Sequence, residues 1–224
     1  MTRGWIIAFA SSKGGPGKTT CAICLGTEFV LSGYRVALID ADPNQHLAAW
    51  GALSEHERLD VVGRVTEENI LERIREAAAS SDFVLVDLEG TANNALTYAV
   101  SKADLVIVPA QPSRMDLQEA YRAAALVERA GEVVERTIPY RVLLSKMPIL
   151  PTRAARHARE QLERSGIPVL STELLERTAF REMSFHGRSP SEIAPGSNAA
   201  LNVRALADEI VACLRANGEA RRAA

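Results

Sequence analysis

The chain has 224 residues, of which 47% are hydrophobic and 24% are charged, and its formal net charge is -2. This composition is typical of a globular protein, and the length is sufficient for a sizeable core. No apolar run approaches the roughly 18 residues that a membrane span needs, and the N-terminus lacks a signal-peptide pattern. Three cysteines, an odd number, predict no disulfide framework and favour the reducing cytoplasm.

Apolar runs of strand length alternate with segments of helical spacing along the chain. Strands are expected at residues 5–10, 36–39, 59–62, 83–86, 105–108, 140–144 and 168–170. Helices are expected at residues 18–31, 45–53, 67–79, 117–130, 153–164 and 199–216, and a loop at the Ser-, Pro- and Gly-rich residues 184–198. Strands that are apolar throughout and separated by helices predict one α/β domain, residues 1–224, with a doubly wound, mostly parallel sheet flanked by helices.

A glycine-rich loop, Lys13-Gly14-Gly15-Pro16-Gly17-Lys18-Thr19-Thr20, follows the first predicted strand and opens the first helix. This is the context of a P-loop, in which backbone N–H groups and the helix N-terminus hold phosphate oxygens. Lys18 is expected to reach the β- and γ-phosphates of a nucleoside triphosphate. The Thr19 hydroxyl is expected to bind magnesium.

The loop departs from the ordinary P-loop pattern at two positions. Ser12 stands where a glycine is usual, and an extra cation, Lys13, lies beside the glycines. Lys13 cannot easily point into its own phosphate pocket, but it is well placed to reach a phosphate on a facing subunit. Hydrolysis would then depend on dimerisation, as it does with an arginine finger. A solvated loop charge is the alternative interpretation of Lys13.

Three aspartates follow predicted strands, at the sheet edge where ligands bind in such folds. Asp87 ends the strand at residues 83–86 and fits the Walker B role of holding a magnesium-bound water. Asp40 and Asp42 follow the strand at residues 36–39. One of these two is expected to support the magnesium shell and the other to orient the attacking water.

These motifs resemble those of the deviant Walker A ATPases of the ParA/MinD family. The loop matches the pattern KGGxGKTT, residues 40–43 look like the D-x-D-P motif, and residues 104–117 are similar to DxVxxPxxPSxxDL. The resemblance implies a slow ATPase that uses ATP and Mg²⁺ and dimerises with nucleotide. It also implies that Lys13 acts across the dimer, Asp42 orients the attacking water, Asp40 helps near magnesium and Asp87 serves as Walker B.

Two segments depart from the family pattern. After Asp87, where relatives often have a Thr-Pro-Pro turn, the chain reads Leu88-Glu89-Gly90-Thr91, so that Glu89 adds a carboxylate near the switch. The segment expected to contact the base, Ser145-Lys146-Met147-Pro148, has no clear counterpart. The preference for ATP over GTP therefore rests on the resemblance, and a role in which nucleotide is bound but barely hydrolysed stays open.

Positive charge is concentrated in one part of the chain. Residues 1–140 hold 13 Lys/Arg and 19 Asp/Glu, whereas residues 141–188 hold nine Lys/Arg and five Asp/Glu. Contacts with the phosphates of nonspecific double-stranded DNA are expected from Arg153, Arg156, Arg159, Arg177, Arg181 and Arg188. The alternative is a solvated helix face on which Glu160 and Glu163 pair with the arginines.

Several branches of the family remain as alternatives. The sequence begins at the first strand, as in the short ParA proteins of plasmid partition and in VirC1-like proteins of conjugative DNA transfer, and similar proteins position protein clusters. By that resemblance we expect a nucleoid-associated protein with a small ParB-like or cargo-adaptor partner. A MinD-like membrane role is disfavoured because residues 217–224 contain no large apolar side chain.

A metabolic ligase or an iron protein is a less favoured alternative from another functional class. A ligase would need a second-substrate pocket, for which the sequence has no motif. An iron protein would need paired cluster cysteines, which Cys213 alone does not supply. Cys21 and Cys24 form a CxxC early in the first predicted helix, where packing against the sheet is favoured over redox or zinc chemistry.

Overall fold

The computed structural model describes residues 3–90 and 93–223, without side chains beyond residue 219. In this described part, seven strands form one sheet in the order β3-β2-β4-β1-β5-β6-β7, and each neighbouring pair is parallel. The strands are β1 (Trp5–Phe9), β2 (Val36–Ala41), β3 (Leu59–Val62), β4 (Phe83–Leu88), β5 (Leu105–Ala110), β6 (Tyr140–Met147) and β7 (Leu174–Leu175). The predicted parallel α/β sheet is confirmed.

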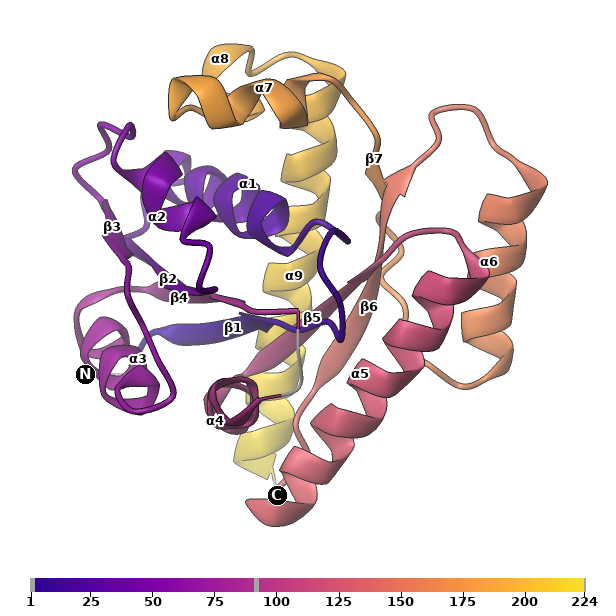
Figure 1. Ribbon diagram of the computed structural model, residues 1–224, viewed down its shortest axis with the longest axis horizontal. Coiled ribbons are helices and arrows are strands. Elements are labelled where there is room, and N and C mark those ends of the chain that lie inside the picture. Colours follow the sequence, from indigo (N-terminus) through magenta and orange to yellow (C-terminus); the bar gives the residue numbers. More distant parts are fainter. Residues whose placement is uncertain (1–2, 91–92, 224) are drawn as a thin grey trace.

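Helices cover both faces of this sheet (Figure 1). One face carries α3 (Ile70–Ser80), α4 (Asn94–Lys102), α5 (Arg114–Val133) and α6 (Arg153–Arg164). The other face carries α1 (Lys18–Leu31), α2 (His46–Gly51), α7 (Ala179–His186), α8 (Pro190–Ile193) and α9 (Asn198–Ala223). The central strands β1, β2, β4 and β5 therefore bury side chains on both faces, which explains why their sequences are largely apolar. No described helix combines the length and apolar character needed to cross a bilayer.

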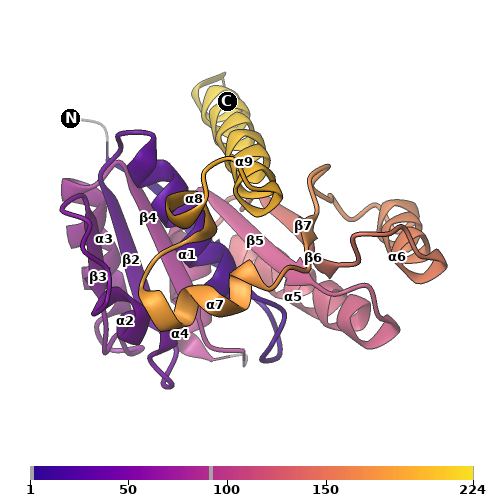
Figure 2. The same cartoon turned by 90° about the horizontal axis from the view of Figure 1, so that it is seen from above.

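The central position of β1 determines where a ligand can bind. β4 and β2 lie on one side of β1, and β5, β6 and β7 lie on the other. The connections therefore run to opposite sides of β1, although all the strands point the same way. The loop that follows β1 lies at the carboxyl edge of the sheet. A crevice at such a switch point is where parallel α/β folds bind their ligands. Figure 2 shows the sheet from the side of α7, with α3 and α6 near its two ends.

The sequence predictions fail in several places. Helices α4 and α7 were not expected, and the strand expected at residues 168–170 is reduced to a single bridge between Val142 and Val169. The true edge strand, β7, comes later. The expected loop at residues 184–198 contains the end of α7 and all of α8, and the last helix continues to residue 223. Thr91, named in the departing turn, and the side chains of residues 220–224 lie outside the described residues.

Helix α1 is enclosed by its neighbours. Its residues 21–30 are all buried, because α2, α8, α9 and the sheet surround it. Burial raises the pKa of the Cys21 thiol to about 12 and also raises the pKa of Cys24. Both thiols therefore stay protonated near neutral pH, as expected of packing residues.

Glu28 is the charged residue within this buried stretch of α1. It is 4% exposed, and its Oε1 lies 2.9 Å from Nε of Arg204 on α9. A carboxylate at this depth is destabilising unless a cation compensates it. The pair therefore joins α1, and with it the loop after β1, to the last helix.

Replacing Arg204 with Ala should lower the free energy of unfolding by about 2 kcal/mol, because Glu28 would keep a buried charge without its partner. Urea denaturation measures this change. The double variant Glu28→Gln/Arg204→Ala should recover most of the loss, since the buried group is then neutral. Equal stability of Arg204→Ala and the wild-type chain would contradict the assignment.

Candidate functional site

The loop after β1 has the backbone conformation of a phosphate cradle. Gly15 and Gly17 have φ angles of 92° and 102°, in the left-handed region that favours glycine, and Gly17 is the N-cap of α1. Among the described residues, the N–H groups of Gly15 and Gly17 have no hydrogen-bond acceptor. The loop therefore offers free donors at a helix N-terminus, which is the physical basis of anion binding.

Lys18 lies at the base of this loop. It is 6% exposed, and its Nζ donates a hydrogen bond of 2.9 Å to Oγ of Ser11. Burial lowers the pKa of Lys18, and the nearby carboxylates of Asp87, Asp42 and Glu89 oppose that effect. An ammonium in this position is a strong site for phosphate oxygens, because little water competes for it.

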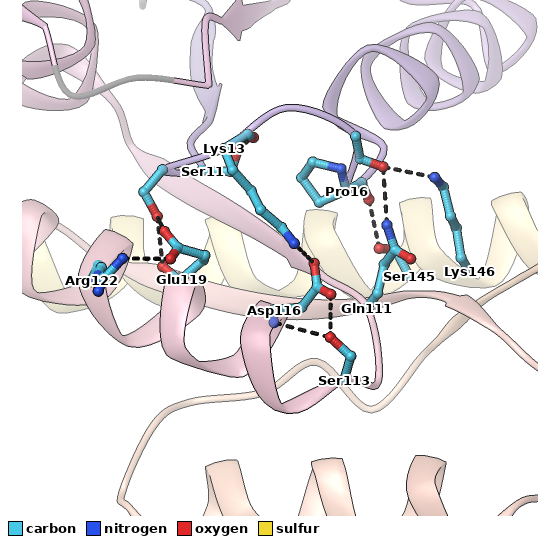
Figure 3. A network of polar contacts seen from close by, with 12 residues as sticks. Ser11, Lys13, Pro16, Gln111, Ser113, Asp116, Glu119, Arg122, Ser145 and Lys146 are labelled. Carbon is cyan, nitrogen blue, oxygen red and sulfur yellow. Dashed lines mark hydrogen bonds and ion pairs between the residues drawn. The ribbon is translucent and has the colours of Figure 1, made fainter.

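Three side chains hold the loop from outside (Figure 3). Ser145 Oγ donates to the Pro16 carbonyl at 2.7 Å, and Lys146 Nζ donates to the Gly15 carbonyl at 2.7 Å. Gln111 Nε2 donates to the same Gly15 carbonyl at 3.1 Å. The segment without a clear family counterpart, residues 145–148, thus contacts the loop itself. Sequence analysis missed this role because the contacting residues are far apart along the chain.

Thr19 and Asp87 meet beside the cradle, as their predicted roles in magnesium binding require. Thr19 Oγ1 donates to Asp87 Oδ2 at 2.6 Å, while Asp87 Oδ1 is buried without a hydrogen-bond partner among the described residues. Burial raises the pKa of Asp87 to about 7, although the Thr19 hydrogen bond and Lys18 act in the opposite direction. A neighbouring cation would strongly stabilise the charged form of a carboxylate buried in this way.

These oxygen donors fit Mg²⁺. Magnesium at P-loops prefers one or two protein oxygens and completes its shell with water and phosphate. The described residues include no cluster of three or more His, Cys, Asp or Glu side chains that could cage a metal. A hydroxyl beside an unpartnered carboxylate oxygen is the donor set that a shared magnesium and phosphate site needs.

Asp40 and Asp42 differ in their contacts. Asp40 is fully buried, and its two oxygens accept N–H groups from Asp42 at 3.0 Å and Ala48 at 2.8 Å. Burial raises the pKa of Asp40, and these hydrogen bonds lower it. Asp40 therefore fixes the loop that carries Asp42. The partly exposed Asp42 accepts hydrogen bonds from both the backbone and the side chain of Asn44 at 2.9 Å.

Lys13 lies at the rim of the loop and contacts its own chain. Its Nζ lies 2.8 Å from Oδ1 of Asp116 at the start of α5, and its side chain is 37% exposed. Ser12 beside it donates to the Glu119 carboxylate on the same helix. Figure 3 shows that Glu119 also pairs with Arg122. Asp116 and Glu119 are functional neighbours that we did not assign from sequence, although Asp116 belongs to the family-like segment.

The residues after β4 pack directly against the loop. A β-carbon at Gly90 would lie 2.3 Å from the carbonyl carbon of Lys13, so no larger residue fits there without movement. Glu89 is partly buried, and its Oε2 accepts a hydrogen bond of 3.1 Å from Asn93. Glu89 thus lies next to the residue that packs against the loop.

A cavity of about 550 Å³ adjoins the loop on the side of β6 and α7. Its wall combines loop residues, such as Gly17 and Thr20, with apolar side chains from α1, α2 and α7. Lys146, Arg177 and Arg181 add positive charge to the wall. A space of this size beside a phosphate cradle can accept a ribose and a base.

The six predicted DNA-contacting arginines do not form one surface. Arg153 and Arg156 are exposed on α6, at the β7 end of the sheet, and Arg188 is exposed after α7. Arg159 lies 2.9 Å from Glu173 and also donates to the Leu170 carbonyl, so it serves internal contacts. Arg177 and Arg181 line the cavity beside the loop.

Comparisons with known proteins identify relatives. A family model described as VirC1 protein matches residues 5–200. A protein named ParA from Rhizobium radiobacter is 33% identical over 177 residues, which cover 78% of this chain and 80% of the relative. A protein named virC1 from the same organism is 30% identical over 190 residues, covering 81% of each chain.

Among solved structures, the ATP complex of an McdA variant from Cyanothece superposes with a TM-score of 0.79 at 15% identity, covering 94% of this chain and 97% of that one. This likeness supports the P-loop fold. Together with the matched family model and the deviant glycine loop, it shows that the chain belongs to the VirC1 protein family, within the ParA/MinD-like P-loop proteins.

Proposed function

We propose that this protein is a slow ATPase that uses Mg²⁺, dimerises when it binds ATP and binds nonspecific DNA. The observation that carries the proposal is the arrangement around the loop: free N–H groups, a buried Lys18, and an unpartnered Asp87 oxygen beside Thr19. Each of these groups would be satisfied by one part of a magnesium-bound triphosphate. The whole described chain would act as one ATPase domain.

The cradle's own residues would bind the phosphates. The Pro16 carbonyl and the Gly17 N–H belong to one trans peptide group and therefore point in opposite directions. Because Ser145 holds the carbonyl outward, the Gly17 N–H faces inward, toward a phosphate oxygen. Gly14, Gly15, Thr20 and the N-terminus of α1 would complete the cradle, with Lys18 at the β- and γ-phosphates. The adjoining cavity would receive the ribose and adenine.

Magnesium, when bound, would draw negative charge from the β- and γ-phosphates and so assist departure of the γ-phosphoryl group. Thr19 and Asp87 would hold it, Asp87 through a bound water. Asp40 would keep the loop after β2 in place by its two backbone contacts. Asp42 would orient the attacking water after releasing Asn44.

Lys13 would complete the site of a second copy. In the isolated chain its ammonium pairs with Asp116, which is 9% exposed, so the contact holds Lys13 at the rim of the loop. A phosphate on a facing subunit carries more negative charge than Asp116 and would compete for the same ammonium. The exchange of partners would couple ATP binding to dimerisation.

The cargo would be positioned or segregated along DNA. A relative named ParA supports this role, and a small ParB-like or adaptor protein would stimulate hydrolysis and release. The match of residues 5–200 to the VirC1 family favours a second candidate, a factor in conjugative DNA transfer. Positioning of a protein cluster is a further alternative. In each case the protein would work at the nucleoid in the cytoplasm, without a membrane partner.

Replacing Ser145 with Ala should weaken ATP binding by roughly threefold to tenfold, because one hydrogen bond that orients the Gly17 N–H is lost. Titration calorimetry with a slowly hydrolysed ATP analogue measures the affinity. Ser80→Ala, a hydroxyl deletion on α3, is the matched control. An unchanged affinity in Ser145→Ala would show that the outer contact does not shape the cradle.

The variant Asp42→Ala should accumulate as a dimer in the presence of ATP, because it binds nucleotide but cannot hydrolyse it and separate. Size-exclusion chromatography with and without ATP measures the change. Lys13→Ala should stay monomeric under the same conditions. An Asp42→Ala chain that elutes as a monomer with saturating ATP would contradict the dimer proposal.

The double variant Arg153→Ala/Arg156→Ala should bind DNA more weakly, with a salt dependence reduced by about two phosphate contacts. Fluorescence anisotropy with unrelated duplexes across a range of salt concentrations measures both effects. The matched control is Arg73→Ala/Arg75→Ala, which removes two exposed cations from α3. Equal losses in the two double variants would indicate a general charge effect rather than a DNA contact on α6.

A further inference from the structure

Glu89 is a carboxylate to which neither the phosphate cradle nor the magnesium site assigns a role. The last paired residues of β2 and β4 are Ala41 and Leu88, so Asp42 and Glu89 each follow one residue later. Neighbouring strands lie about 4.8 Å apart, and the two residues therefore start from adjacent points on the sheet edge. Glu89 therefore occupies the same position after β4 that Asp42 occupies after β2.

The alternation of side chains along the strands places four carboxylates in two layers. Leu38 and Leu85 belong to the core beneath α1. Asp40 and Asp87, two residues further along each strand, share that face and lie opposite each other. They form the buried layer, at 0% and 1% exposure. Asp42 and Glu89 follow two residues later, just beyond the strand ends, and both are partly exposed.

The protein fixes one side of the Glu89 carboxylate and leaves the other accessible. Asn93 donates to Oε2 at 3.1 Å, while its own Oδ1 caps α4 by accepting the Leu96 N–H at 2.9 Å. Gly90 is packed against the backbone of Lys13 and Gly14, which fixes the chain beside Glu89. Within the described ranges, Oε1 of Glu89 has no donor and the side chain forms no ion pair.

The charge of Glu89 also reaches the phosphate site. Burial lowers the pKa of Lys18, and Asp87, Asp42 and Glu89 act against it. Glu89 is therefore close enough to Lys18 to act on the same ammonium as Asp42. A carboxylate at this point can accept a hydrogen bond from a water molecule but would repel a phosphate oxygen.

We propose that Glu89 is a second catalytic carboxylate, which accepts one hydrogen bond from the attacking water while Asp42 accepts the other. This proposal rests on the proposed ATPase function. Holding both hydrogens directs a lone pair of the water toward the γ-phosphorus. The water oxygen forms the new bond to phosphorus as the bond to the β–γ bridging oxygen breaks. Its electron pair leaves on ADP, and the water's proton ends on the released phosphate.

The test compares ground-state and transition-state binding in Glu89→Gln. Glutamine keeps the size of the side chain and an oxygen that can accept from Asn93, but it is a weaker acceptor for the attacking water. Affinity for a nonhydrolysable ATP analogue should stay within twofold of wild type. Affinity for ADP with aluminium fluoride, which mimics the transferring phosphoryl group, should fall at least tenfold, and single-turnover hydrolysis should fall to the same extent.

Glu68→Gln, an exposed carboxylate near α3, is the control and should match the wild-type chain in all three measurements. A Glu89→Gln chain with wild-type affinity for the aluminium fluoride complex, or with unchanged or faster hydrolysis, would overturn the role of Glu89. A wild-type chain that binds the ATP analogue but never turns over ATP would instead contradict the proposed function. The two failures are therefore distinguishable.

Discussion

A loop that turns its N–H groups inward must turn carbonyl groups outward, and those carbonyls need donors. The structure meets this constraint by placing β6 and the segment between β5 and α5 against the outside of the loop. Ser145, Lys146 and Gln111 supply three donors to two successive carbonyls. Lys146 has a strained backbone, because its φ of 50° lies in a region that non-glycine residues rarely occupy. It lies next to an irregularity in the pairing of β6 and β7. The phosphate cradle is thus a property of the sheet and not of the glycines alone.

The parallel register of β2 and β4 positions the buried carboxylates, as the outer donors position the loop. Because Asp40 pairs with Asp87 across β2 and β4, two acidic groups are buried side by side under the N-terminus of α1. Burial raises the pKa of Asp87 and of Asp40, and Lys18 is the cation that opposes this effect at Asp87. Under the proposed function, magnesium would add positive charge beside these carboxylates. The phosphates would offer acceptors to the loop N–H groups and could draw Lys13 away from Asp116.

Much of this arrangement could be predicted from the sequence, because it depends on local signals. The spacing of apolar residues predicted the sheet and most of its helices, and the glycines predicted a loop between β1 and α1 at the carboxyl edge of the sheet. Contacts between distant segments could not be predicted in this way. Ser145 lies 129 residues from Pro16, and no local pattern indicates that contact. Helix α4 was missed because its Thr97, Tyr98 and Val100 weaken the helical propensity, while burial against the sheet stabilises it. The strand at 174–175 was too short to be recognised, and the apolar run at 168–170 took its place in the prediction.

In the proposed dimer, hydrolysis depends on Lys13 acting on the nucleotide of the facing subunit. Mixing Lys13→Ala and Asp42→Ala chains before adding ATP tests it, because each homodimer lacks one required group in both sites. In a mixed dimer, the Lys13→Ala subunit keeps Asp42 and receives Lys13 from its partner, so one site is complete. Each mixed dimer should hydrolyse ATP at about half the wild-type rate per dimer, because one of the two sites of a symmetric dimer is complete. No recovery in mixed dimers whose formation is verified would show that Lys13 serves its own subunit.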